Sequence, residues 1–298
     1  MRKFTIVGIG ELLWDLFPAR KQLGGAPANF AYISGLLGDD AIVVSRIGSD
    51  SLGDEALTRL RSLDLETSHI QRDDAHATGT VKIELRDDGQ PQFEITQSVA
   101  WDYLEFSSNL EDLASKADAT CFGSLAQRSP QSRKTIEQFL ESTRKDAVRV
   151  FDVNLRQAFY SSEILVRSAE KADILKLNHD ELPIMAQVSG GPVLSQMESA
   201  RWLSQRFDLS LVCVTRGSGG SLIVTKDTFH NHPGHQVQVA DTVGAGDAFT
   251  AALVHHYLRG SDLAMMNDAA NRMGAWVASQ PGATPPANPE VQEKVRVP

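Results

Sequence analysis

Cysteine and long apolar runs are scarce in this sequence. Its two cysteines, Cys121 and Cys213, each lie in a short apolar run, so we expect buried thiols in a reducing compartment and no disulfide. No apolar run approaches the ~18–20 residues that span a bilayer, and the stretch after Met1 is too short for a signal peptide. We therefore expect a cytoplasmic protein without a membrane partner.

Positive charge is scarce as well, because 29 Lys and Arg stand against 38 Asp and Glu, a net charge of −9. This balance, without a basic run, argues against nucleic acid as a partner. The GxxxxGK[ST] motif of P-loop proteins and the GxSxG motif of serine hydrolases are absent. GxGxxG is incomplete, since Leu13 and Phe249 occupy its third glycine position. The sequence therefore argues against a P-loop NTPase, a serine hydrolase and a dinucleotide-dependent oxidoreductase.

Short β-branched runs alternate with longer amphipathic stretches, which predicts an α/β fold whose mostly parallel sheet is flanked by helices on both faces. Hydrophobic residues make up 42% of the 298 residues, enough for the core of a single domain over 1–298. The expected strands are Phe4–Gly8, Ile42–Arg46, Thr120–Phe122, Val148–Val153, Ile174–Leu177, Leu211–Thr215 and Ser221–Thr225. The expected helices are Pro27–Leu37, Gly53–Leu63, Arg133–Lys145, Ile164–Lys171, Leu194–Phe207, Ala245–Arg259 and Leu263–Ser279.

One region departs from this alternation. Thr78–Glu84 and Gln92–Thr96 alternate with a period of two around Asp87-Asp-Gly89, which predicts a hairpin. With the extended piece Leu12–Phe17, it would form a small β lid built from about residues 12–22 and 78–100. An ordinary edge hairpin is the alternative.

The segment Asp241-Thr-Val-Gly-Ala-Gly-Asp-Ala-Phe249 joins a glycine turn to an apolar helical run. A helix start has unpaired N–H groups and a partial positive charge, so it suits a phosphate, and Gly244 and Gly246 let the backbone approach one. Asp247 would repel phosphate unless a proton must be removed beside it. We therefore interpret Asp247 as a base, and Ala245 with the two glycines and Asp247 as the anion-holding turn. A helix start capped by acids is the alternative.

Other polar residues lie where expected strands or helices begin or end. Gly24-Gly25 opens a helix, Asn29 lies one turn inside it, and Asp15 follows the first strand region. These residues suit a ligand with several hydroxyl groups, although Asp15 and Asn29 would also serve as caps. Asp152-Val-Asn-Leu-Arg156 places three polar side chains after a strand, for a ligand or for a buried Asp152–Arg156 salt bridge.

The order of these motifs resembles that of the ribokinase-like (pfkB) carbohydrate kinases over essentially the whole chain. The segments that carry the resemblance are Gly10–Asp15, Gly24–Asn29, Arg46–Asp50 with Leu52-Gly53, Phe122–Ser124, Asp152–Arg156, Lys176–Asn178 with Glu181, Thr215–Gly220, Asp241–Phe249 and Gly282–Pro285. The resemblance implies a kinase that uses ATP and Mg²⁺ to phosphorylate a primary hydroxyl group of a small sugar.

The resemblance also implies site residues. It implies sugar contacts from Asp15, Gly24, Gly25, Asn29, Arg156 and Asp247, and nucleotide contacts from Asn178, Thr215, Gly217, Gly220, Gly246 and Asn271. It implies an indirect Mg²⁺ site at Asn178 and Glu181, which alone would indicate a helix capping box. A K⁺ site is implied at Asp241, Val243, Val277, Gln280 and Gly282.

Within this family, Gly24–Asn29, Ser124–Pro130 and Asp152–Arg156 look most similar to fructokinases, which implies conversion of D-fructose to fructose 6-phosphate. Ribose, 2-keto-3-deoxygluconate or a nucleoside are alternative substrates. A non-catalytic sugar sensor is another alternative, although a sensor would not need Asp247. Apolar lid residues would be costly in water, so we expect Val81, Ile83, Phe93 and Ile95 to pack on the sugar site or on a second lid in a homodimer.

The spacing His230-x-His232-x-x-His235 suggests a metal site. It lies in a segment with Pro and Gly, and the sequence shows no Cys or acidic partner nearby. We therefore expect a solvated loop.

Overall fold

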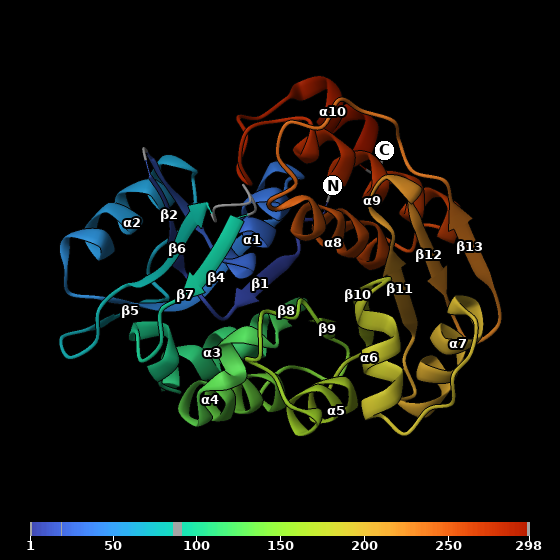
Figure 1. The fold of residues 1–298 in the computed structure, drawn as a ribbon, viewed down its shortest axis with the longest axis horizontal. Coiled ribbons are helices and arrows are strands. Elements are labelled where there is room, and N and C mark those ends of the chain that lie inside the picture. Colours follow the sequence, from blue (N-terminus) through green and yellow to red (C-terminus); the bar gives the residue numbers. More distant parts are fainter. Residues whose placement is uncertain (1, 19, 86–90, 297–298) are drawn as a thin grey trace.

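A nine-stranded sheet crosses the molecule (Figure 1) in the computed structural model, which describes residues 2–18, 20–85 and 91–296. Its strands, in order across the sheet, are β13 (Phe229–His232), β12 (Ser221–Val224), β11 (Leu211–Thr215), β10 (Ile174–Asn178), β9 (Val148–Asp152), β8 (Ala119–Gly123), β1 (Thr5–Ile9), β4 (Asp40–Gly48) and β5 (Ile70–Asp73). Neighbours from β5 to β11 are parallel, whereas β12 and β13 pair antiparallel. This confirms the predicted fold class.

Helices cover both faces of this sheet (Figure 1). One face carries α1 (Ala26–Leu36), α2 (Ser51–Ser62), α8 (Ala245–Leu258), α9 (Leu263–Ala278) and α10 (Pro289–Val295). The other face carries α3 (Ser108–Lys116), α4 (Pro130–Glu141), α5 (Ser162–Glu170), α6 (Glu181–Val188) and α7 (Gln196–Arg206). Two separate cores result because successive strand residues point to opposite faces: in β1, Ile6 belongs to the first core and Val7 to the second.

Every expected strand and helix is present, with ends shifted by a few residues. The largest shift is in α4, expected at Arg133–Lys145, because Pro130 is suited to a first helical position. The elements β3 (Arg20–Gly24), β5, β13, α3, α6 and α10 were not predicted as separate elements. Of these, β5 and β13 are four-residue edge strands, too short and polar for a clear period. Pro183 lies in the first turn of α6, where proline is tolerated. In the sequence, a proline usually indicates that a helix ends or is interrupted, and α6 was missed for this reason.

A second, four-stranded sheet lies beside the amino-terminal part of the large one (Figure 1). Its strands, in order, are β3 (Arg20–Gly24), β2 (Leu13–Phe17), β6 (Gly79–Leu85) and β7 (Pro91–Ile95). The predicted β6–β7 hairpin is confirmed, and β2 lies parallel to β6. The expected turn residues Asp87 to Gly89 fall outside the described residues.

Two of the four lid positions expected to be exposed are buried. Val81 and Ile95 are 6% and 7% exposed and belong to the chain's own core, next to Leu13 and Trp101. These two side chains therefore need no second lid to cover them, whereas packing of the lid on the sugar site stays a prediction. The side chains of Ile83 and Phe93 lie outside the described part of the chain.

Both cysteines are buried and free, as the sequence predicted. Burial raises the pKa of the Cys213 thiol to about 12, so the group stays protonated and unreactive. Among the described residues, no helix is both long enough and apolar enough to cross a membrane.

Candidate active site

The glycine turn before α8 depends on Gly244. Its φ of 78° is left-handed, and a Cβ there would lie 2.4 Å from the Cβ of Ala283. The amide of Ala245 donates to Thr242 O at 3.3 Å, so this N–H group is not free, contrary to the prediction. The amides of Gly246 and Asp247 have no hydrogen-bond partner within the described chain. These two N–H groups are available to an anion.

At this turn, Asp247 contacts Asn29 of the amino-terminal segment Gly24–Asn29. Asn29, in the first turns of α1, donates from Nδ2 to Asp247 Oδ2 at 2.8 Å across 218 residues of sequence. Figure 1 shows α1 and α8 side by side, which explains the contact. Burial raises the pKa of Asp247 to about 6, and Asp152 adds to the rise, while the Asn29 hydrogen bond opposes it. Asp247 is thus ionised at neutral pH and basic enough to accept a proton.

The floor of the site is a buried ion pair that sequence reasoning missed. Asp152 and Lys176 occupy paired positions in the parallel strands β9 and β10. Lys176 Nζ lies 3.1 and 3.0 Å from the two Asp152 carboxylate oxygens, and Thr250 Oγ1 donates to Oδ2 at 3.0 Å. The suggested Asp152–Arg156 salt bridge was therefore wrong. Arg156 is exposed and donates to Leu155 O.

A cavity opens above this floor, between the start of α8 and the start of α1. The residues that line it are Ala26, Pro27, Phe30, Cys121, Phe122, Gly123, Asp152, Asn154, Asp247 and Thr250. Most of the wall is apolar, and Asp152, Asn154, Asp247 and Thr250 supply its polar side chains. This is a usual composition for a small-molecule site.

Of the predicted ligand residues, Gly24 lies against Asp15, and Gly25 lies against a second acid, Glu11. A Cβ at Gly24 would lie 2.6 Å from Asp15 Oδ2, and one at Gly25 (φ 114°) only 2.4 Å from Glu11 O. Glu11 is 4% exposed, and its Oε1 accepts from Ala26 N at 3.3 Å. Burial raises the pKa of Asp15 to about 6 and that of Glu11 to about 7. The sequence signal for Glu11 was an acid two residues after the end of the buried strand β1.

Asn178 and Glu181 form a capping arrangement at the start of α6. Asn178 Oδ1 accepts from the amides of Asp180 and Glu181 at 2.9 Å, and Glu181 Oε2 accepts from Asn178 N at 2.8 Å. Glu181 Oε1 accepts from Leu155 N at 2.8 Å. Each oxygen of the buried Glu181 carboxylate therefore already accepts a backbone N–H, so direct ligation of a metal ion is disfavoured.

The predicted nucleotide residues lie at the carboxyl end of β11 and beyond it. Thr215 ends β11, and Gly217 and Gly220 both have positive φ, 56° and 78°, in the turn to β12. Asn271, on α9, is 7% exposed and donates from Nδ2 to Ser221 Oγ at 2.7 Å. In this structure Asn271 ties α9 to β12.

Comparison with known proteins decides the family. The pattern of the pfkB family carbohydrate kinases matches residues 15–290. The chain belongs to this family. The resemblance noted in its motifs is thereby confirmed, and the protein is a carbohydrate kinase.

Relatives of this pfkB kinase span nearly its whole length. A Salmonella typhimurium fructokinase is 29% identical over 257 residues, which cover 83% of this chain and 82% of that protein. The structure of an uncharacterized Pyrococcus horikoshii sugar kinase in complex with ATP matches with a TM-score of 0.82 at 28% identity, covering 97% and 99% of the two chains. A Vibrio cholerae fructokinase with fructose, ADP and calcium matches with a TM-score of 0.79 at 26% identity, covering 98% of each.

The predicted monovalent-cation residues of the kinase are close together. Asp241 Oδ1 accepts from Val243 N at 3.0 Å, and Oδ2 accepts from Gly282 N at 3.2 Å. Val277 and Gln280 lie at the end of α9, where Gln280 N donates to Val277 O at 2.9 Å. The terminal carbonyl groups and dipole of a helix favour a cation at that end.

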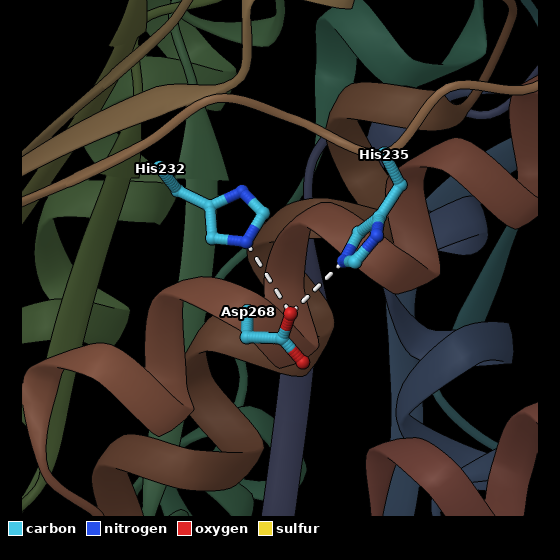
Figure 2. A group of neighbouring side chains, drawn as sticks. All are labelled: His232, His235 and Asp268. Atoms are coloured by element: carbon cyan, nitrogen blue, oxygen red, sulfur yellow. Dashed lines mark hydrogen bonds and ion pairs between the residues drawn. The ribbon is translucent and has the colours of Figure 1, made fainter.

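The His232 segment of the kinase has an acidic partner, so the expectation of a solvated loop was wrong (Figure 2). His232 Nε2 and His235 Nε2 lie 3.3 and 3.0 Å from Asp268 Oδ1, which α9 supplies. His232 Nδ1 accepts from Gly234 N at 3.0 Å, so the neutral ring carries its hydrogen on Nε2, facing Asp268. A metal ion bound between these side chains would need a lone pair on His232 Nε2, but that nitrogen carries the hydrogen. Because Arg272 also pairs with Asp268 at 3.1 Å, we interpret the group as a clamp between β13 and α9.

Proposed function

We propose that this kinase transfers the γ-phosphoryl group of ATP to the primary hydroxyl group of D-fructose, forming fructose 6-phosphate. The Asn29–Asp247 hydrogen bond carries the proposal, because it joins the predicted sugar-binding segment to the base beside the anion-holding turn. The Salmonella typhimurium and Vibrio cholerae fructokinases are relatives that support fructose. Ribose, 2-keto-3-deoxygluconate and nucleosides are the other candidate acceptors. A sugar sensor is disfavoured because the base and the turn are both intact.

In the proposed reaction, the sugar hydroxyl oxygen attacks the γ-phosphorus of ATP. The bond from this phosphorus to the β–γ bridging oxygen breaks, and ADP leaves with that electron pair. Asp247 accepts the hydroxyl proton, and the amides of Gly246 and Asp247 donate to the transferred group. Phosphoryl transfer depends mainly on such positioning and charge stabilisation. Asp15, Gly24, Gly25, Asn29 and Arg156 would hold the sugar.

The residues present fit the nucleotide better than they fit a direct metal ligand set. The free amides of Gly246 and Asp247 suit phosphate oxygens, and we propose that Thr215, Gly217, Gly220, Asn178 and Asn271 line the nucleotide pocket. Mg²⁺, when bound, supplies positive charge to the phosphates. Asn178 and Glu181 would act on it only through water, since their side-chain oxygens already accept backbone N–H groups.

The four-stranded sheet would serve as the lid of the single kinase domain. Asp15 lies on β2 of this sheet, so a sugar bound by Asp15 and Asn29 would contact both the lid and the helical face. Excluding water matters here because hydrolysis of ATP competes with transfer.

The test of the proposed function is a coupled assay of ADP formation over a panel of sugars and nucleosides, with product analysis by ³¹P NMR. We expect the largest kcat/KM with D-fructose and a 6-phosphate product. A higher kcat/KM with another acceptor would replace fructose in the proposal. A folded protein without turnover on any acceptor would contradict the kinase reaction itself.

Activity should fall as the pH is lowered through about 6. The pKa of Asp247 is raised to about 6 by burial and by Asp152, and the protonated carboxyl cannot accept the hydroxyl proton. We expect log kcat/KM to decline with unit slope below that pH. Glu11→Gln should show the same decline at low pH if the decline is caused by protonation of Asp247. A flat profile between pH 5 and 7 would contradict the assignment.

K⁺ should activate the enzyme through Asp241. We propose a site formed by the Asp241 carboxylate and by backbone carbonyl groups of Val243, Val277, Gln280 and Gly282. Asp241→Asn removes its negative charge, so activation by K⁺ should weaken, while kcat falls less than it does for Asp247→Asn. The measurement is kcat in KCl against tetramethylammonium chloride at equal ionic strength. A parent enzyme with equal rates in both salts would contradict the site.

We propose a homodimer through the lid, in a cytoplasmic enzyme whose buried free thiols suit a reducing compartment. Within the described residues, the four-stranded sheet has β3 and β7 as open edges, and such edges pair readily with another chain. Sedimentation velocity should therefore show a dimer. A monomer with and without sugar would contradict the dimer and leave the kinase proposal intact.

A further inference from the structure

Lys176 is a buried cation beside the anion-holding turn, and the reaction described above does not use it. The residue is 7% exposed, and an ideal Cβ at Gly246 would lie only 3.1 Å from its Nζ. Gly246 supplies one of the two free amides. The ammonium group is therefore directly beside the first turn of α8, on the side of the helix that faces β9 and β10.

The position of this ammonium group is tightly determined. Both Asp152 oxygens lie within hydrogen-bond distance of Nζ, at 3.1 and 3.0 Å. Thr250 Oγ1, one turn into α8, lies 3.0 Å from both Asp152 Oδ2 and Gly246 O and shares its one hydrogen between them. A chain of contacts thus links Lys176 through Asp152 and Thr250 to the backbone of the turn.

Lys176 stays charged in this environment. Burial lowers its pKa, but the carboxylates of Asp152, Glu181 and Asp247 outweigh this effect and raise the pKa above its ordinary value. A charge that is both buried and fixed acts on its neighbours with little screening by water or salt.

We propose that Lys176 is a positioning residue for phosphoryl transfer: clamped by Asp152 beneath the first turn of α8, its ammonium group keeps Asp247 ionised and adds positive charge beside the anion-holding amides. The inference rests on the proposed role of Asp247 as the base. Without Lys176, the Asp152 carboxylate would face Asp247 with no counter-charge from the strands below.

Other charged and titratable groups face Asp247 and must be compared with Lys176. In the described chain they are Glu11 after β1, Cys121 on β8, Asp152 on β9 and Arg156 beyond β9. The acids and the thiol cannot favour the ionised carboxylate. Arg156 can, but it is exposed, so its charge is screened by solvent. Lys176 is therefore the buried cation in this group.

The test measures, in Lys176→Met and in Asp152→Asn, the pH at which kcat/KM falls on the acid side of the profile. This pH reports the apparent pKa of Asp247. Losing the cation should move the apparent pKa of Asp247 up by about one pH unit, and losing the neighbouring anion should move it down by a similar amount. A purely structural role would not produce shifts of opposite sign. Thr250→Val is the matched control, since it removes a hydrogen bond to Asp152 without changing any charge. In this variant the pH at which activity falls on the acid side should be unchanged.

Lys176→Met leaves Asp152 buried without a partner, and this variant can fail to fold. The double variant Lys176→Met/Asp152→Asn then replaces it, and its Asp247 pKa should lie above that of Asp152→Asn alone. The same pKa values are measured without substrate by ¹³C NMR titration of the carboxyl groups, assigned with Asp247→Asn. This readout distinguishes failure of the inference from absence of kinase activity. An Asp247 pKa that does not move on loss of Lys176 would overturn the inference.

Discussion

Asp247→Asn should lower kcat by about 10²–10⁴-fold, the usual contribution of a general base. The asparagine keeps the size of the side chain, and its carbonyl oxygen can still accept from Asn29 Nδ2, so the turn should keep its shape. It cannot accept the proton of the attacking hydroxyl. The affinity for ATP should be unchanged or slightly higher, because a negative charge beside the γ-phosphate has gone. Steady-state kinetics with both substrates saturating and calorimetric titration of ATP measure the two effects.

Asp112→Asn is a suitable control for this variant. It changes the net charge by the same amount, but Asp112 is an exposed residue of α3 whose carboxylate pairs with Lys116. Its kcat should match that of the parent. Near-normal kcat in Asp247→Asn would show that another group takes the proton. Asp152 would be the next acid to test, although Lys176 and Thr250 already bind its oxygens.

Gly244→Ala should damage both stability and catalysis. An alanine with φ near 78° costs about 1–2 kcal/mol for its left-handed conformation. Its Cβ would also lie 2.4 Å from the Cβ and 2.7 Å from the Cα of Ala283, which adds about 1–3 kcal/mol of overpacking. Relief of this clash must displace the turn that carries the amides of Gly246 and Asp247. Because small displacements of reacting groups are costly, we expect kcat to fall about 10²-fold.

Gly190→Ala separates the cost of the left-handed conformation from the cost of the contact with Ala283. Gly190 has nearly the same φ, 79°, but a Cβ there would meet no heavy atom within 4 Å. It should lose only the conformational part of the stability and keep its kcat. Urea unfolding monitored by tryptophan fluorescence gives both free energies. Equal losses of stability in the two variants would show that the contact with Ala283 does not constrain the turn.

Most of the fold could be predicted from the sequence because each core element carries its own periodic signal. The parallel strands are buried on both faces and are therefore continuous apolar runs, and the helices between them are amphipathic. The elements that were missed lacked such a signal. β13 is a polar edge strand of four residues, and α6 is short with a proline in its first turn.

The turn from Asp241 to Asp247 could also be interpreted from the sequence, because its chemistry is local. A left-handed glycine, free amides at a helix start and an acid in the first turn of that helix lie within four consecutive residues. The contact of Asn29 with Asp247 is different, since it depends on α1 packing against α8. The sequence indicated both residues, and the fold brought them together.

The sequence by itself determined the class of fold, the order of most of its elements and the glycine turn that precedes Asp247. Only the tertiary structure decided which charges are neighbours. It paired Asp152 with Lys176 instead of Arg156, because these two residues share a register in adjacent strands. It brought Asp268 to His232 and His235 because α9 packs on β13. The physical reason is that an ion pair or a clamp depends on distance in space, which strand register and helix packing set between residues far apart in the chain.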